Sequence, residues 1–146
     1  MELTTKELVI LDLDCTSKDT VIQTLAQKMA EVGVVENYDE FLASLMEREN
    51  IAPTSVGYEI GLPHGKSSTV KKGAIAFASL KKPIIWDLEN NEKVERIFML
   101  AIPESEKGST HVELLVNLSR KILDNNFRDS LKRAKIATEV VELINR

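Results

Sequence analysis

The 146-residue chain contains only one cysteine, Cys15, and no long hydrophobic run. A single cysteine excludes an internal disulfide and a cysteine metal cluster, and we expect Cys15 to be a small residue at the end of a strand. No apolar segment reaches the roughly 20 residues that a helix needs to span a bilayer. Residues 1–14 carry charges where a signal peptide would have an apolar core. We therefore expect a cytoplasmic protein with no direct membrane insertion.

The chain also lacks a basic patch. Its 19 lysine and arginine residues are interspersed with 23 aspartate and glutamate residues, for a formal net charge of −4. This balance disfavours a nucleic acid partner. No Gly-x-Gly-x-x-Gly motif, Walker loop or internal repeat is present, so a nucleotide-binding protein has no support. With 43% hydrophobic residues and a typical domain length, residues 1–146 are expected to form one domain.

Hydrophobic periodicity predicts three main strands. Residues 8–13 alternate apolar and polar side chains and predict the first strand. The apolar runs 74–80 and 94–102 predict interior strands that are covered on both faces. Between these runs, residues 83–87 predict an edge or connecting segment, and the polar residues 89–93 predict a turn. We expect the aromatic side chains in this region, Trp86 and Phe98, to belong to the core.

Capping signals predict helices at about 16–31, 38–47 and 110–123, and two shorter helices at 127–134 and 138–145. The expected caps are Thr16 with Asp19, Asn37 with Glu40, and Thr110 with Glu113, and Gly33 is the expected stop of the first helix. The alternation of strands and helices predicts an α/β fold. Arg48 then emerges at the end of the second helix, where the chain enters the segment that leads to His64.

His64 is one of two histidines and lies between Pro63 and Gly65 after a short apolar run. Pro63 fixes its own φ, and we expect Gly65 to let the main chain turn sharply and approach a ligand. A neutral imidazole held in this way can act as a nucleophile. The alternative is a loop histidine with no catalytic or binding function.

The segment that leads to His64 resembles the active-site region of the fructose- and mannitol-type enzyme IIA (EIIA) domains of the bacterial phosphoenolpyruvate-dependent sugar phosphotransferase system (PTS). The residues that match the family pattern are Arg48, Glu49, Thr54, Gly57, Ile60, Pro63, His64 and Gly65. Gly61 stands where the family usually has alanine. The segment around His111 resembles the family's stretch in which a His-Leu pair opens a helix, so the resemblance covers nearly the whole chain.

The resemblance implies a mixed β-sheet with helices on both faces and a phosphocarrier without a metal or organic cofactor. His64 would accept a phosphoryl group from the small carrier HPr. It would pass the group to a cysteine of a cognate EIIB, which phosphorylates sugar during import through the membrane component EIIC. The resemblance to fructose-type members is the only basis for expecting fructose or a related hexose or hexitol as the transported sugar. Because the chain runs from Met1 to just past its last predicted helix, we expect a free-standing subunit.

Phosphoryl transfer needs positioned groups that stabilise the phosphoryl oxygens. Arg48 can donate a fork of hydrogen bonds to these oxygens. His111, in the first turn of a helix whose N-terminus favours anions, can donate one more. Thr54 is expected either to bind the phosphoryl group or to stabilise a turn with its hydroxyl. Glu59 is expected either to orient a histidine ring or to be a solvated carboxylate.

Two other functions stay open at this point. A regulatory, nitrogen-type EIIA keeps the phosphorylatable histidine and uses its charge state to control protein binding, but the fructose-type likeness of the C-terminal half favours transport. A metal-dependent hydrolase with His64, His111 and Glu59 as ligands is disfavoured, because the helix-spaced ligand pairs of known metal motifs are absent.

Overall fold

The computed structural model describes residues 2–104 and 109–146, with the side chains of residues 109–112 outside this description. The described strands form one five-stranded sheet in the order β1-β4-β5-β2, and β3 also pairs with β5. Only β4 and β5 are antiparallel to each other, so the sheet is mixed. The strands are β1 Val9–Leu13, β2 Ile60–Gly61, β3 His64–Ser67, β4 Ala74–Asp87 and β5 Glu92–Pro103.

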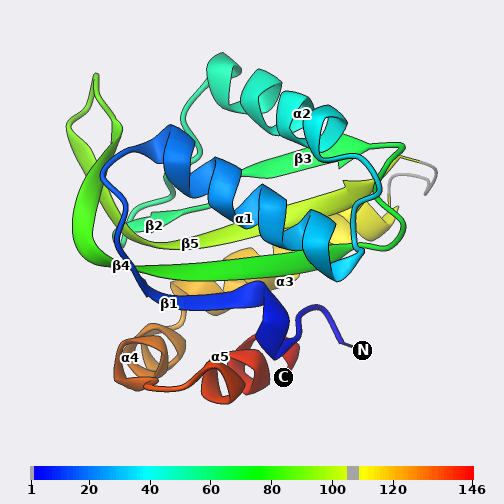
Figure 1. The fold of residues 1–146 in the computed structure, drawn as a ribbon. Coiled ribbons are helices and arrows are strands. Elements are labelled where there is room, and N and C mark those ends of the chain that lie inside the picture. The colour runs from blue at the N-terminus through cyan, green and yellow to red at the C-terminus, as the bar shows by residue number, and fades with distance from the viewer. Residues whose placement is uncertain (1, 105–108) are drawn as a thin grey trace.

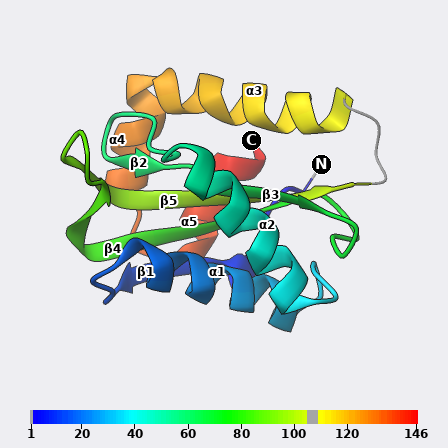
Figure 2. The same cartoon turned by 90° about the horizontal axis from the view of Figure 1, so that it is seen from above.

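Helices cover both faces of this sheet (Figures 1 and 2). They are a 3-10 turn at Lys6–Leu8, α1 Lys18–Val32, α2 Tyr38–Ile51, α3 Ser109–Leu123, α4 Asn125–Arg133 and α5 Ala137–Asn145. α1 and α2 pack on one face, and α3, α4 and α5 on the other. The expected α/β fold with a mixed sheet and helices on both faces is therefore confirmed.

Two hydrophobic clusters lie on the two faces of the sheet, and β4 contributes to both. Ala74, Ala76 and Ala78 face α1 and α2, whereas Ile75 and Phe77 face the C-terminal helices. This alternation follows from the period of two in a strand, and the continuous apolar run follows from burial on both faces. The small alanines on one face let α1 and α2 lie close to the sheet.

Two of the predicted caps are wrong. Ser17, and not Thr16, is the N-cap of α1, because Ser17 has extended backbone angles and its side chain accepts a hydrogen bond from the Thr20 amide. α3 begins at Ser109, so Thr110 lies inside its first turn rather than before it. The Asn37 cap is confirmed, since its side chain accepts from the Glu40 amide at 3.0 Å. Gly33 ends α1 in the left-handed conformation, with φ of 91°.

The segment predicted to connect the two interior strands is instead the second half of β4. Ile84 pairs with Val94 and Asp87 pairs with Glu92, so β4 and β5 form one long hairpin. Pro83, which has no N–H to donate, lies where the register shifts, between Ser79 and Ile84. The strand continues past the proline because the side chain of Trp86 is buried, at 2% exposure.

Gly65 also has a different role from the one expected. It lies inside β3, and it is not among the residues with positive φ. A Cβ at this position would overlap Ser44 Oγ and would come within 3.2 Å of Phe41 Cε1 and Leu45 Cγ. Gly65 is therefore needed for the close packing of α2 on β3, rather than for a turn or for the approach of a ligand.

Replacement of Gly65 by alanine should loosen this contact. The added methyl forces Ser44 and Leu45 away from β3, and such overpacking costs about 1–3 kcal/mol. We expect urea denaturation to show a loss of this size for Gly65→Ala. Ser44→Ala in the same chain removes the nearest atom and should restore part of the stability. Equal stability of the wild type and the single variant would contradict this packing.

Candidate functional site

The chain between α2 and β3 forms a small, tight hairpin that ends at His64. The Val56 amide donates to the Ile60 carbonyl, and the Ile60 amide donates to the Gly57 carbonyl, both at 3.0 Å. Gly57, Tyr58 and Glu59 at the tip have φ of 87°, 57° and 60°. Tyr58 and Glu59 adopt this left-handed region although their side chains disfavour it, which costs of order 1–3 kcal/mol each. The surrounding structure must therefore hold this hairpin firmly.

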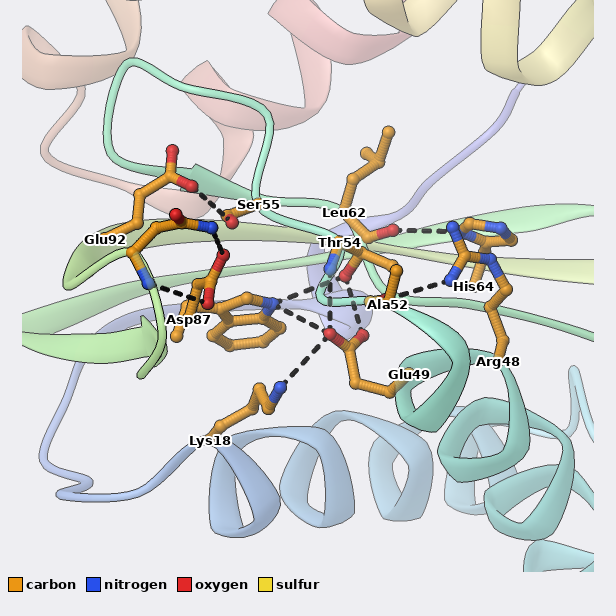
Figure 3. Close-up of polar contacts among 12 residues, drawn as sticks. Lys18, Arg48, Glu49, Ala52, Thr54, Ser55, Leu62, His64, Asp87 and Glu92 are labelled. Carbon is orange, nitrogen blue, oxygen red and sulfur yellow. Dashed lines mark hydrogen bonds and ion pairs between the residues drawn. The ribbon is translucent and has the colours of Figure 1, made fainter.

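His64 is the first residue of β3, and its ring is oriented by the backbone. The ring atom Nδ1 lies 3.0 Å from the carbonyl oxygen of Leu62. A carbonyl can only accept a hydrogen bond, so Nδ1 carries the proton. In the neutral ring the lone pair is then on Nε2. Figure 3 shows the imidazole with Nδ1 turned to the Leu62 carbonyl.

Arg48 extends from the last turn of α2. Arg48 lies one helical turn after Ser44. Ser44 packs directly against Gly65, the residue that follows His64. In Figure 3 the Arg48 guanidinium and the His64 ring overlap in the view, at the same end of the site. Arg48 Nη1 donates to the Ala52 carbonyl at 3.0 Å, which uses one of the five guanidinium N–H groups.

Glu49 matches the family pattern, but the sequence analysis gave it no role in the site. Its side chain is 2% exposed, and its carboxylate accepts four hydrogen bonds (Figure 3). Oε2 accepts from the Thr54 amide at 2.8 Å, from Trp86 Nε1 at 3.1 Å and from Lys18 Nζ at 3.3 Å. Oε1 accepts from the Thr54 hydroxyl at 2.7 Å. A buried carboxylate is stable only when it is paired and hydrogen-bonded in this way.

The sequence did contain a signal for Glu49. Phe41, Leu45 and Glu49 recur every four residues, so they lie on one face of α2. All three are buried. The predicted helix ended at residue 47, and this left the carboxylate outside the buried face. The real helix continues to Ile51, because Glu49 has the partners that its burial requires.

The side chain of Thr54 makes a contact within the protein, of the kind expected of a hydroxyl that stabilises a turn. Thr54 is 5% exposed, and its hydroxyl hydrogen is donated to Glu49. Glu59, in contrast, is exposed at the hairpin tip, and its backbone carbonyl accepts from the amides of Glu95 and Arg96. Its side chain borders a hollow of about 560 Å³ that Arg96 and Arg128 also line. The partner of the His64 ring is thus a backbone carbonyl rather than Glu59.

His111 belongs to the first turn of α3, but its side chain lies outside the described part of the structure. Its role next to a phosphoryl group stays a prediction. Among the residues that the structure describes, there is no group of three histidine, cysteine or acidic side chains that could hold a metal ion. Within the same residues, no helix combines the length and the apolar character needed to cross a membrane.

Gly61 lies directly against the ring of Trp86. A Cβ on Gly61 would lie 3.2 Å from Trp86 Cε2 and 3.3 Å from Cζ2. The absence of a side chain at this position therefore makes room for the indole that donates to Glu49. An alanine here, as the family usually has, would require the ring to move by a few tenths of an ångström.

The fold and the site define an α/β protein that presents an oriented imidazole at the edge of its sheet. Residues 2–146 match the family model "Phosphoenolpyruvate-dependent sugar phosphotransferase system, EIIA 2", and the chain belongs to this family. The fructose-specific EIIA component of Haloferax volcanii is 31% identical, over 97% of this chain and 92% of that protein.

Longer proteins contain a similar segment. The chain is 32% identical, over 98% of its length, to the 2-O-α-mannosyl-D-glycerate-specific EIIABC component of Escherichia coli, but it spans only 22% of that relative. Two solved structures share the fold at lower identity. One is the nitrogen regulatory protein IIA-Ntr of Neisseria meningitidis, with a TM-score of 0.88, 24% identity and coverage of 98% and 97% of the two chains. The other is the E. coli complex of enzyme IIAMTL with phosphorylated enzyme IIBMTL, with a TM-score of 0.81, 21% identity and coverage of 97% and 96%.

The contact between Gly61 and Trp86 can be tested with Gly61→Ala. We expect a small net loss of stability, of about 1 kcal/mol or less, because the lower entropy of the unfolded chain offsets part of the crowding. Since Trp86 is the only tryptophan, a shift of its fluorescence emission reports directly on the ring. Gly33→Ala, with nothing near its Cβ position, is the control that should leave the emission unchanged. An unchanged spectrum in Gly61→Ala would contradict the contact.

Proposed function

We propose that this protein is the EIIA phosphocarrier of a sugar PTS and that His64 carries the phosphoryl group. The observation that supports this is the 3.0 Å contact between His64 Nδ1 and the Leu62 carbonyl. It leaves the Nε2 lone pair available for attack on phosphorus. The fixed ring orientation removes the need to select the correct tautomer during the encounter with a phosphorylated partner.

The proposed transfer has two steps. Nε2 of His64 attacks the phosphorus atom held by the phosphohistidine of HPr, the P–N bond of the donor breaks, and a P–Nε2 bond forms. A cysteine thiolate of a cognate EIIB then attacks the same phosphorus, and the P–Nε2 bond breaks. The proton on Nδ1 stays on the ring in both steps. Neither step needs a metal or an organic cofactor.

Arg48 and His111 are proposed to stabilise the phosphoryl oxygens. Arg48 can do so without leaving the Ala52 carbonyl, because four other N–H groups of the guanidinium remain. His111 would donate from its ring, close to the N-terminus of α3 and its partial positive charge. We assign Thr54 an indirect role through the hairpin, and Glu59 a place at the exposed rim of the site.

The partners are inferred from the family. The solved complex of IIAMTL with phosphorylated IIBMTL supports an EIIB as the acceptor, and the EIIABC relative supports coupling to an EIIC in the membrane. HPr as donor, a cytoplasmic location, and one EIIA domain over residues 1–146 belong to the same proposal. The full-length match to a fructose-specific component makes fructose or a related hexose or hexitol the proposed sugar.

A regulatory function is the second candidate. It is favoured by the close fold similarity to IIA-Ntr. A nitrogen-type EIIA would accept the phosphoryl group on the same histidine but would not pass it to a sugar-phosphorylating EIIB. Sugar phosphorylation in the presence of a cognate EIIB and EIIC therefore separates the two functions, since only the transport protein supports it.

Phosphoryl uptake is tested by incubation with phosphoenolpyruvate, enzyme I and HPr, followed by intact mass measurement. We expect the wild type to gain one acid-labile phosphoryl group, His64→Ala to gain none, and His111→Ala to gain it more slowly. A wild type that stays unmodified would contradict the phosphocarrier function. Equal uptake by His64→Ala would contradict the assignment of the acceptor.

The role of Arg48 predicts a graded effect on the uptake rate. Hydrogen bonds to charged groups contribute about 1.5–3 kcal/mol, so Arg48→Ala should slow uptake by about 10- to 150-fold. Arg48→Lys keeps the charge but loses the fork, and its rate should lie between those of the wild type and Arg48→Ala. Rapid quench-flow measurement of phosphoryl transfer from HPr to each variant checks this order of rates. Arg48→Ala with the rate of the wild type would contradict the assigned role.

A further inference from the structure

Hydrogen bonds, joined through the backbone of Thr54 and Leu62, link the buried Glu49 carboxylate to the ring of His64. Glu49 accepts from the amide and the hydroxyl of Thr54. The Thr54 carbonyl accepts from the Leu62 amide at 2.9 Å. The Leu62 carbonyl accepts from His64 Nδ1. We call these four residues, Glu49, Thr54, Leu62 and His64, the Glu49–His64 relay.

We propose that Glu49 is a positioning residue that, through this relay, sets which ring nitrogen of His64 carries the proton and which carries the lone pair. The inference rests on the proposed function for its consequence, since the tautomer matters only if His64 accepts a phosphoryl group. The relay itself is a property of the unphosphorylated protein.

Each step of the relay restrains the next one. Two bonds from Glu49 fix both the backbone and the side chain of Thr54, so the Thr54 carbonyl has one direction. That carbonyl holds the Leu62 amide across the base of the hairpin. The Leu62 amide and carbonyl belong to adjacent peptide groups, and the buried Leu62 side chain, at 5% exposure, limits rotation between them. The carbonyl oxygen is thus held at the position that Nδ1 of His64 requires.

Glu49 can act as the fixed point of the relay because it is held from the opposite side as well. Trp86 Nε1 and Lys18 Nζ reach the same carboxylate from β4 and from the start of α1. Lys18 Nζ also lies 5.6 Å from the centre of the Trp86 ring. Movement of the carboxylate would break hydrogen bonds in a site with little water to replace them.

The same residue also connects the two proposed catalytic groups. Glu49 follows Arg48 directly in the last turn of α2, so the bonds that fix Glu49 also fix the backbone from which the guanidinium extends. Arg48 and His64 come from different elements, a helix and an edge strand. The Glu49 carboxylate links the last turn of α2 to the hairpin that leads to His64 (Figure 3).

The relay is tested by the ring tautomer of His64 in the unphosphorylated protein, from long-range ¹H–¹⁵N NMR spectra. Wild type should show a proton on Nδ1. Glu49→Gln removes the charge and replaces one of the two acceptor oxygens by an amide donor, so Thr54 should be held more weakly. The hydrogen bond from Nδ1 to the Leu62 carbonyl should then be lost, and the Nε2–H tautomer should become the main form. Thr54→Val removes only the hydroxyl and should give a mixture of both tautomers. It is the milder second variant if Glu49→Gln folds poorly.

Ser55→Ala is the matched control, because it removes a side-chain hydrogen bond of the same hairpin, to Glu92, that is not part of the relay. It should keep the proton on Nδ1. Folded Glu49→Gln or Thr54→Val protein with the tautomer of the wild type would overturn the proposal, and so would a Ser55→Ala variant that shifts as far as Glu49→Gln. A wild type that accepts no phosphoryl group contradicts the proposed function alone, because the tautomer is measured without enzyme I or HPr.

Discussion

The buried carboxylate of Glu49 is the interaction on which the site depends. Its four donors come from α1, from β4 and from the hairpin before His64, segments that are far apart in the sequence. Removal of a carboxylate from water is costly unless such bonds replace its hydration. Because all four bonds require one arrangement of these segments, the carboxylate favours that arrangement over looser packings. The strained hairpin tip, the last turn of α2 and the start of β3 are thereby held in one geometry.

The sheet explains why the histidine is presented at a surface. β3 is short and pairs with β5, so it forms an edge where α2 covers one face. Gly65 and Ser67 of β3 are buried, while His64 and Lys66, on the other face, are half-buried and exposed. In the proposed function, the partners that exchange a phosphoryl group must reach the ring as folded proteins, and an edge strand gives them access. The rigid core behind the strand keeps the ring oriented during the encounter.

Much of the fold follows from local signals in the sequence. The first strand, the Asn37 cap and the stop at Gly33 depend on neighbouring residues alone, and each was predictable. The extension of β4 beyond Pro83 was not, because it depends on pairing with β5 and on the burial of Trp86. Thr16 and Ser17 are both good caps, and only the backbone angles of the folded chain select Ser17.

In the candidate site, too, local sequence signals predict some features, and others depend on contacts between distant segments. His64 and Arg48 were identified from the motif around them, since their chemistry is carried by their own side chains. The role of Glu49 depends on donors from distant segments, such as Lys18 and Trp86. No local pattern predicts these partners, although the four-residue spacing in α2 does predict burial. The sequence analysis expected Gly65 to let the chain turn and approach a ligand. The structure shows instead that a side chain at this position would overlap Ser44 on the facing helix.

The most direct test of this account is to determine which ring nitrogen of His64 carries the phosphoryl group after phosphorylation of ¹⁵N-labelled wild type. The ³¹P–¹⁵N couplings of the phosphorylated protein distinguish the two positions. A ring held by the Leu62 carbonyl through Nδ1 can be phosphorylated only on Nε2, and this is the result that we expect. A phosphoryl group on Nδ1 would contradict the account, because the contact that connects Glu49 to the imidazole could not exist in the reacting protein.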